Sequence, residues 1–175
     1  MILVILSAPK KKTCLVTHCL GRGVFASTPI PSGTILDTCP VLILPPGEVE
    51  THTRHTLLNH YSYNWPLPPY HPLHPSNASP DAKATTITTQ ALILGLGSMF
   101  NHSSIAQNVG WLRDVENEVI VYKTLRDVVA GEELCISYGP AEHLTFVDVE
   151  GEARRKEEER EEEGGEEVLG RIMLD

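Results

Sequence analysis

The chain consists of short apolar stretches separated by glycine, proline and polar residues. Between residues 61 and 65, large aromatic side chains alternate with small polar ones, and this period of two predicts a β-strand. Many short strands between Gly/Pro turns favour an α+β domain that is mostly β. The segments that we expect as strands are 1–6, 24–26, 34–36, 41–44, 61–65, 85–88, 108–111, 119–122 and 134–136.

Helical and irregular segments are fewer. Residues 48–60 have mixed helical character and predict one short helix, and the apolar run 90–97 allows a second one. Residues 116–118 predict a hairpin turn. Six prolines between residues 66 and 80 argue against regular structure, so we expect 66–83 to be a long exposed loop inserted in the domain.

Length and charge indicate one domain with a tail. The chain has 175 residues, and we expect a domain over 1–149 followed by an acidic tail over 150–175, helical or disordered. The tail holds eleven acidic and five basic side chains, a charge of −6, which leaves −3 of the total −9 for the rest. Because the body has no basic stripe, direct binding to nucleic acid is disfavoured, whereas a basic peptide fits an acidic protein.

Cysteine spacing and hydropathy argue against a metal site and against a membrane span. Four cysteines stand apart without a CxxC pair, and no second ligand lies at metal-ligand spacing from His102. The apolar run 1–6 is too short to cross a membrane. We therefore expect reduced, buried thiols and an intracellular protein without metal.

Three polar segments carry candidate chemistry: 21–25 (Gly-Arg-Gly-Val-Phe), 98–103 (Ser-Met-Phe-Asn-His-Ser) and 131–139 (Gly-Glu-Glu-Leu-Cys-Ile-Ser-Tyr-Gly). The glycines of the first let backbone approach a ligand closely, but a plain tight turn uses them too. The polar triple of the second can have a functional role, but a helix N-cap or a turn explains it too. Tyr138 in the third either packs or positions a substrate with its hydroxyl.

Taken in this order and at this spacing, the three segments resemble the SET domain, the fold of most protein lysine methyltransferases, over residues 14–140. The resemblance implies several small curved β-sheets around a knot-like crossing, where the Asn-His-Ser strand passes the segment with the tyrosine. It also implies S-adenosylmethionine as the cofactor. The expected product is a methylated lysine in a histone tail or another basic protein.

The resemblance implies roles for individual residues as well. Tyr138 orients the lysine amine and the methyl group as the catalytic residue. For the aromatic candidates of the lysine channel, ordinary core packing is the alternative. The cofactor residues are Gly21, Arg22, Gly23, Asn101 and His102, and the channel candidates are Tyr61, Tyr63, Trp111 and Phe146.

The chain departs from many family members in one respect that affects the channel. The residue directly after the Asn-His-Ser triple is Ser104 and not the zinc-binding cysteine of many members, and no cysteine cluster lies downstream. We therefore expect no zinc-bound C-terminal cap. We expect residues 141–149, with Phe146, to close the lysine channel instead. A subunit partner is the alternative, since apolar residues at 168–174 allow docking on a second copy, and a homodimer stays open.

The sequence leaves three functions open. The first is methylation of a histone, with a nuclear location and a role in chromatin regulation, although a cytoplasmic location stays open as well. The second is methylation of a non-histone protein. The third is a non-catalytic SET module that binds peptide or cofactor, against which the presence of Tyr138, Asn101 and His102 argues.

Overall fold

The computed structural model describes residues 2–5, 23–75, 85–139, 144, 147–149 and 151–160. Over these residues the fold is α+β and mostly β, as predicted. The strands are β1 (Ile2–Ile5), β2 (Gly23–Ala26), β3 (Ile35–Ile43), β4 (Ser62–Leu67), β5 (Ile87–Ile93), β6 (Asn101–His102), β7 (Val109–Asp114), β8 (Val119–Thr124) and β9 (Cys135–Ile136). The helices are α1 (Pro46–Thr51), the 3₁₀ turns η1 (Thr53–His55), η2 (Leu57–Tyr61) and η4 (Leu96–Met99), and a helix over 151–160.

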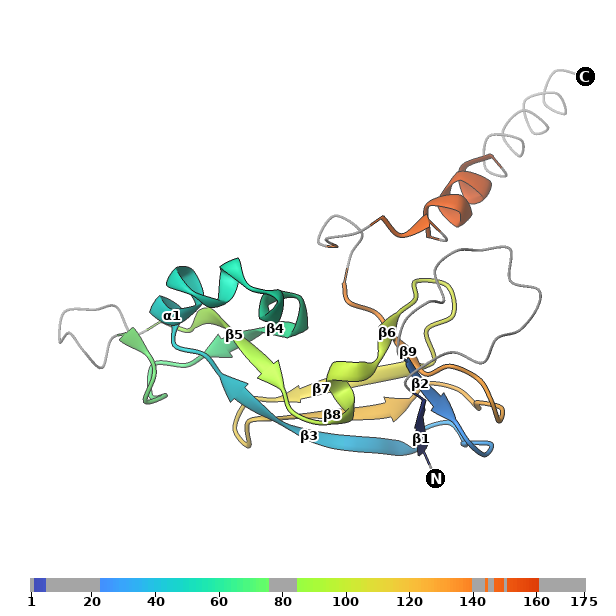
Figure 1. The fold of residues 1–175 in the computed structure, drawn as a ribbon, viewed down its shortest axis with the longest axis horizontal. Helices are drawn as coiled ribbons and strands as arrows, with labels where there is room; N and C mark the ends of the chain where they lie inside the picture. The colour runs from blue at the N-terminus through green and yellow to red at the C-terminus, as the bar shows by residue number, and fades with distance from the viewer. Residues whose placement is uncertain are drawn as a thin grey trace, which may run out of the picture.

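The strands form three sheets. The largest has the order β4-β5-β3-β8-β7 and is antiparallel throughout, β1 pairs antiparallel with β2, and β6 pairs parallel with β9. Figure 1 shows the large sheet running across the molecule, with α1 beside β4 and β5 at one end and the two small sheets at the other. The chain therefore brings β6 and β9 together at the end of the molecule that also holds β2.

Strand β3 is continuous where the sequence predicted two strands, 34–36 and 41–44. Its first part pairs with β8 up to Pro40, and its last part, Val41–Ile43, pairs with β5. Pro40 lies where the partner changes, a place where a residue without an N–H interrupts the ladder least. Proline thus marks a change of neighbour here and not a strand end.

The first half of the run 90–97 is the end of a strand, β5, and not helix. Thr89, Ala91 and Ile93 are buried while the residues between them are half-buried, which is the alternation of a strand. Strand β5 is hydrogen-bonded on both edges, to β3 and to β4, and one of its faces is buried, so it lies inside the sheet and is as apolar as a buried helix. Only η4 retains the predicted helical character before Asn101.

The expected loop 66–83 begins later than predicted. Pro66 and Leu67 complete β4, and Leu67 is fully buried. His74, which is buried as well, donates a hydrogen bond from Nε2 to the Thr85 carbonyl (2.9 Å). Residues 76–84 lie outside the described part of the chain. The proline-rich segment therefore packs against the domain over its first part.

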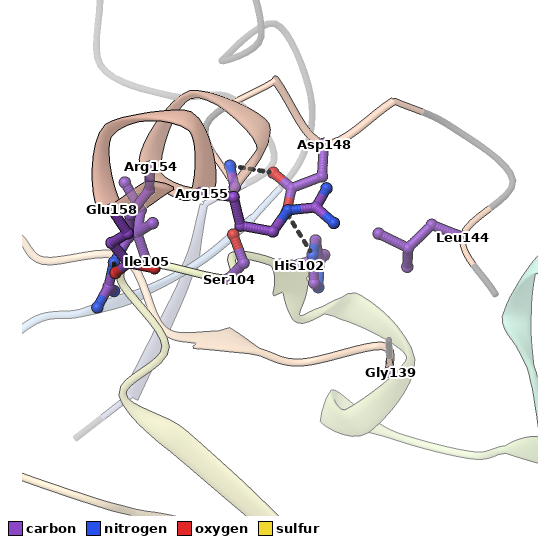
Figure 2. A pocket seen from close by; sticks show the side chains of 10 residues that line it. His102, Ser104, Ile105, Gly139, Leu144, Asp148, Arg154, Arg155 and Glu158 are labelled. Carbon is purple, nitrogen blue, oxygen red and sulfur yellow. Dashed lines mark hydrogen bonds and ion pairs between the residues drawn. The ribbon is translucent and has the colours of Figure 1, made fainter. Parts of the chain in front are cut away.

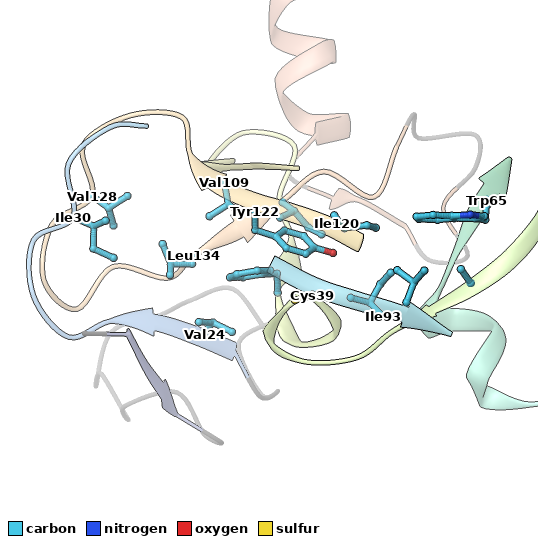
Figure 3. Packing of buried hydrophobic residues seen from close by; sticks show 14 of the residues in the cluster. Val24, Ile30, Cys39, Trp65, Ile93, Val109, Ile120, Tyr122, Val128 and Leu134 are labelled. Atoms are coloured by element: carbon cyan, nitrogen blue, oxygen red, sulfur yellow. The ribbon is translucent and has the colours of Figure 1, made fainter. Parts of the chain in front are cut away.

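One hydrophobic core connects the large sheet to the small ones. Figure 3 shows Tyr122 near its centre, Trp65 at one side, and Ile30 with Val128 at the other. Phe100, which precedes β6, and Ile136, which lies in β9, belong to the same cluster. Core packing thus fixes the backbone on both sides of the candidate site.

Candidate functional site

The candidate site lies where β6 and β9 pair. Asn101 is opposite Cys135 and His102 is opposite Ile136, and the Ser103 amide donates to the Ile136 carbonyl (3.0 Å). This parallel contact is the predicted crossing of the Asn-His-Ser segment and the segment that holds Tyr138.

Tyr138 is held at two points by this crossing. Its hydroxyl donates to the Phe100 carbonyl (2.7 Å), and its backbone N–H donates to Nδ1 of His102 (3.1 Å). The rings of Tyr138 and His102 are 5.3 Å apart. Burial, followed by the nearby charges of Tyr63 and other groups, raises the pKa of Tyr138 to about 12, so its phenol keeps the proton.

Gly23 and Asn101 meet at a carboxylate that sequence reasoning did not assign. The Asn101 amide donates to Oε1 of Glu133 (2.7 Å). A Cβ on Gly23 would collide with the same carboxylate oxygen and lie 3.2 Å from the Asn101 amide nitrogen. A larger residue at position 23 would therefore displace the Glu133 carboxylate from its place beside the crossing. Gly21 and Arg22, the other two residues of the predicted cofactor loop, lie outside the described residues.

His102 borders a cavity between the crossing and the C-terminal helix. The cavity has a volume of about 350 Å³. Figure 2 shows Leu144 on one side and Arg154 with Glu158 on the other. Its lining mixes apolar, acidic and basic groups: His102, Ser104, Ile105, Gly139, Leu144, Asp148, Gly151, Arg154, Arg155 and Glu158.

Asp148 joins this C-terminal segment to His102. One carboxylate oxygen, Oδ2, lies 3.4 Å from Nε2 of His102, and the other accepts from the Gly151 amide (3.1 Å). A hydrogen bond from Ser104, then those from Gly151 and His102, lower the pKa of Asp148. Nothing in the sequence pattern had pointed to Asp148.

Two of the predicted channel aromatics contact one another. The rings of Tyr63 and Trp111 are edge-to-face at 5.4 Å, and the Tyr122 hydroxyl donates to that of Tyr63 (3.3 Å). The Trp111 indole N–H lies 3.4 Å from the Ser137 carbonyl, one residue before Tyr138. Tyr61 is 47% exposed at the end of η2. Phe146 lies outside the described residues, so its role as a channel wall stays a prediction.

Asn108 braces the segment that leads to Tyr138. Its side chain is fully buried and donates to the Glu133 carbonyl (2.8 Å) and to Glu132 (3.0 Å), while it accepts from the Cys135 amide (2.9 Å). A bond from Arg126 is the first cause that lowers the pKa of Glu132. Asn108 therefore holds the backbone at the start of β9.

Two classes of site have no support in the described part of the chain. Within those ranges, no cluster of three or more His, Cys, Asp or Glu side chains is arranged to hold a metal ion. No helix within them is long and apolar enough to cross a membrane.

Comparison with known proteins identifies the family. A family model of the SET domain matches residues 21–139, more than half of the chain. The chain is also 42% identical over 135 residues to a Schizosaccharomyces pombe protein named histone-lysine N-methyltransferase, H3 lysine-37 specific. That match covers 77% of this chain and 76% of the yeast protein. The chain belongs to the SET-domain family of lysine methyltransferases.

Two solved structures are similar at lower identity. A proposed histone methyltransferase of Plasmodium falciparum is 24% identical, with a TM-score of 0.46 over 74% of this chain and 90% of that one. The methyltransferase domain of human PR domain-containing protein 2 is 20% identical, with a TM-score of 0.45 over 83% of this chain and 81% of that one. The family assignment rests on the sequence matches.

The SET-domain structure brings most of the predicted site residues into one region. Tyr138, Asn101, His102 and Gly23 gather around the β6–β9 crossing. The aromatic pair of Tyr63 and Trp111 adjoins Tyr138 through Ser137. Sequence reasoning assigned no role to Glu133 or to Asp148, although both lie within segments already singled out, 131–139 and 141–149.

Proposed function

We propose that this SET domain is an S-adenosylmethionine-dependent protein lysine N-methyltransferase that acts on a histone. The observation that carries the proposal is the placement of Tyr138, whose hydroxyl is anchored on the Phe100 carbonyl beside Asn101 and His102. The name of the yeast relative, a histone H3 methyltransferase, supports a histone as the substrate class.

The residues around the crossing fit S-adenosylmethionine. The cavity beside His102 is within the range of small-molecule sites, roughly 300–1,000 Å³. Gly23 lies next to Asn101, and the space that a Cβ of Gly23 would take is occupied by the Glu133 carboxylate and the Asn101 amide. Gly23, Asn101 and His102 would hold the cofactor, together with Gly21 and Arg22 from the sequence. When bound, the cofactor supplies an electrophilic methyl group on a sulfonium.

The protein has to deliver a neutral lysine amine. A free lysine has a pKa of about 10.4, and an apolar environment lowers it because the ammonium loses hydration. Tyr63 and Trp111, with Tyr61 at the exposed end, offer such walls near Tyr138. Desolvation between aromatic rings thus favours the form of the amine that attacks.

Tyr138 is suited to orient that amine. Its proton is engaged with the Phe100 carbonyl, so the phenol oxygen is left to accept a hydrogen bond from an amine N–H. Because its pKa is about 12, the group stays a neutral phenol and adds no negative charge that would favour the ammonium. The contribution of Tyr138 is therefore alignment for in-line attack.

The wider proposals follow from the substrate class. A basic histone tail suits an acidic protein with a charge of −9, and a histone substrate implies a nuclear location. Binding to nucleic acid and to membranes is not part of the proposal. Closure of the channel by Phe146 and a homodimer through 168–174 stay predictions, because these residues lie outside the described part of the chain.

A methyl-transfer assay tests the proposal. Purified protein is incubated with radiolabelled S-adenosylmethionine and core histones, and Tyr138→Phe is compared with the control Tyr70→Phe, since Tyr70 is 79% exposed. We expect label on a histone lysine, strongly reduced by Tyr138→Phe and unchanged by the control. Cofactor binding in calorimetry without label on histones would contradict the histone substrate. A labelled cell extract then separates another protein substrate from a non-catalytic module.

A further inference from the structure

Asp148 connects the C-terminal helix to the crossing. Its Oδ1 accepts the Gly151 amide (3.1 Å) and its backbone carbonyl accepts the Glu152 amide (3.0 Å), so it caps the helix that continues over 151–160. Its Oδ2 lies 3.4 Å from Nε2 of His102, at the long end of a hydrogen bond. Figure 2 shows the Asp148 carboxylate beside His102, with dashed lines for both side-chain contacts.

The hydrogen-bond partners of His102 determine its tautomer. The Tyr138 backbone N–H donates to Nδ1 (3.1 Å), so Nδ1 is an acceptor and has no proton. The proton is then on Nε2 and points to the Asp148 carboxylate. The imidazole side chain is only 5% exposed, so water has little access to replace either partner.

The same tautomer determines where Tyr138 lies. The backbone of Tyr138 is bound by His102 and its hydroxyl by the Phe100 carbonyl. If the proton moved to Nδ1, two N–H groups would face each other at 3.1 Å, and the backbone at Tyr138 would have to shift. Its hydroxyl would then move away from the Phe100 carbonyl.

We propose that Asp148 is a positioning residue that holds His102 as the Nε2–H tautomer and thereby links docking of the helix over 151–160 to the placement of Tyr138. The inference rests on the proposed methyltransferase function. Asp148 does not touch the reacting groups; it acts through His102. Residues of this helix line the cavity that His102 borders, and Asp148 lines it as well, so the same carboxylate contributes to the cavity wall and holds the histidine that binds Tyr138.

Asp148→Asn tests the link because it keeps shape and cap but reverses one hydrogen bond. Asparagine caps helices as well as aspartate does, so its oxygen stays on the Gly151 amide. Its NH2 group then faces Nε2 of His102 and can donate a hydrogen bond to that nitrogen but accept none from it. We expect the His102 proton to move to Nδ1 and kcat to fall about 10-fold, as for loss of a buried hydrogen bond.

The matched control is Glu152→Gln, an exposed carboxylate in the first turn of the same helix. We expect it to leave kcat and the tautomer of His102 unchanged. The tautomer is read from imidazole ¹⁵N chemical shifts, with the His102 signals assigned by their loss in His102→Ala. Cofactor affinity is measured by calorimetry, and we expect Asp148→Asn to reduce kcat more than affinity.

Each outcome decides for or against the inference. An Nδ1–H tautomer in the unmodified protein would overturn it, even if Asp148→Asn failed to fold. Unchanged kcat in a folded Asp148→Asn whose tautomer has switched would overturn the link to Tyr138. An inactive unmodified protein with His102 in the Nε2–H form would contradict the proposed function and leave the Asp148–His102 contact supported.

Discussion

Asn108→Ala is expected to destabilise the β6–β9 crossing, because it removes hydrogen bonds at the start of β9. The substitution removes the side-chain partner of the Cys135 amide and the side-chain donor to the Glu133 carbonyl, both beside β9. It also removes the bond to Glu132, which keeps Arg126 as a partner. The backbone bonds of Asn108, to the Cys135 carbonyl (3.2 Å) and from the Leu125 amide (2.8 Å), remain in the variant. The perturbation is therefore confined to the side chain.

The size of the effect follows from burial. Asn108 is fully buried and Cys135 is 7% exposed, so water does not replace the lost partners freely. A buried polar group left unsatisfied costs about 1–3 kcal/mol, and two such groups give a loss of about 3 kcal/mol. That is a large part of a stability of about 5–15 kcal/mol.

Urea unfolding measures the loss. Far-ultraviolet circular dichroism reports the sheets, and fluorescence of Trp65 and Trp111 reports the core. Asn64→Ala is the control, because Asn64 is exposed on β4 and accepts one bond from Gln90, and we expect a change within about 0.5 kcal/mol. A loss below about 1 kcal/mol for Asn108→Ala, with an unchanged urea slope, would refute the reasoning.

Three further predictions concern packing and pH. Gly97→Ala places a methyl group 2.5 Å from the ring Cζ and hydroxyl of the buried Tyr122, and we expect it to cost about 1–3 kcal/mol in thermal unfolding. Burial, with a bond to Asp37, raises the pKa of Cys39 from 9.0 to about 11. The folded state therefore keeps a proton that the unfolded chain loses, and stability falls by up to about 3 kcal/mol as pH rises from 9.0 toward 11. Cys39→Ala should flatten that fall in urea unfolding at several pH values. Since the pKa of Tyr138 is about 12, kcat should not decline near the ordinary value of 10.0, and a falling limb there would contradict this assignment.

The sequence predicted the strands that have one buried and one exposed face, and the strands that end in turn residues. The hairpin of β7 and β8 was expected around 116–118, and Glu118 indeed adopts a positive φ of 53° there. The strand at 24–26 was recognised as β2. In these cases the local pattern is sufficient, because the pairing partner is close in the chain or the apolar run is short.

The errors came from contacts that local patterns do not encode. The run 90–97 looks apolar on all sides because β5 has neighbours on both edges and a covered face, which only the assembled sheet reveals. A role for Asp148 follows only from the folded structure, in which the chain beyond β9 lies against His102, 46 residues earlier in the sequence. By contrast, the proximity of Tyr138, Asn101 and His102 was predictable, because these residues lie in motifs that a family shares.

The β6–β9 pair has a consequence for how the protein folds. Each strand has two residues, and Asn101 and Cys135 are separated by the whole β7–β8 hairpin. A contact of two residue pairs between strands far apart in the sequence stabilises the fold little while the chain between them is disordered. The β7–β8 hairpin has to form first, because it shortens the loop that the contact closes. The candidate site is therefore expected to assemble last, and a folding intermediate with an intact large sheet would not yet hold Tyr138 against Phe100 and His102.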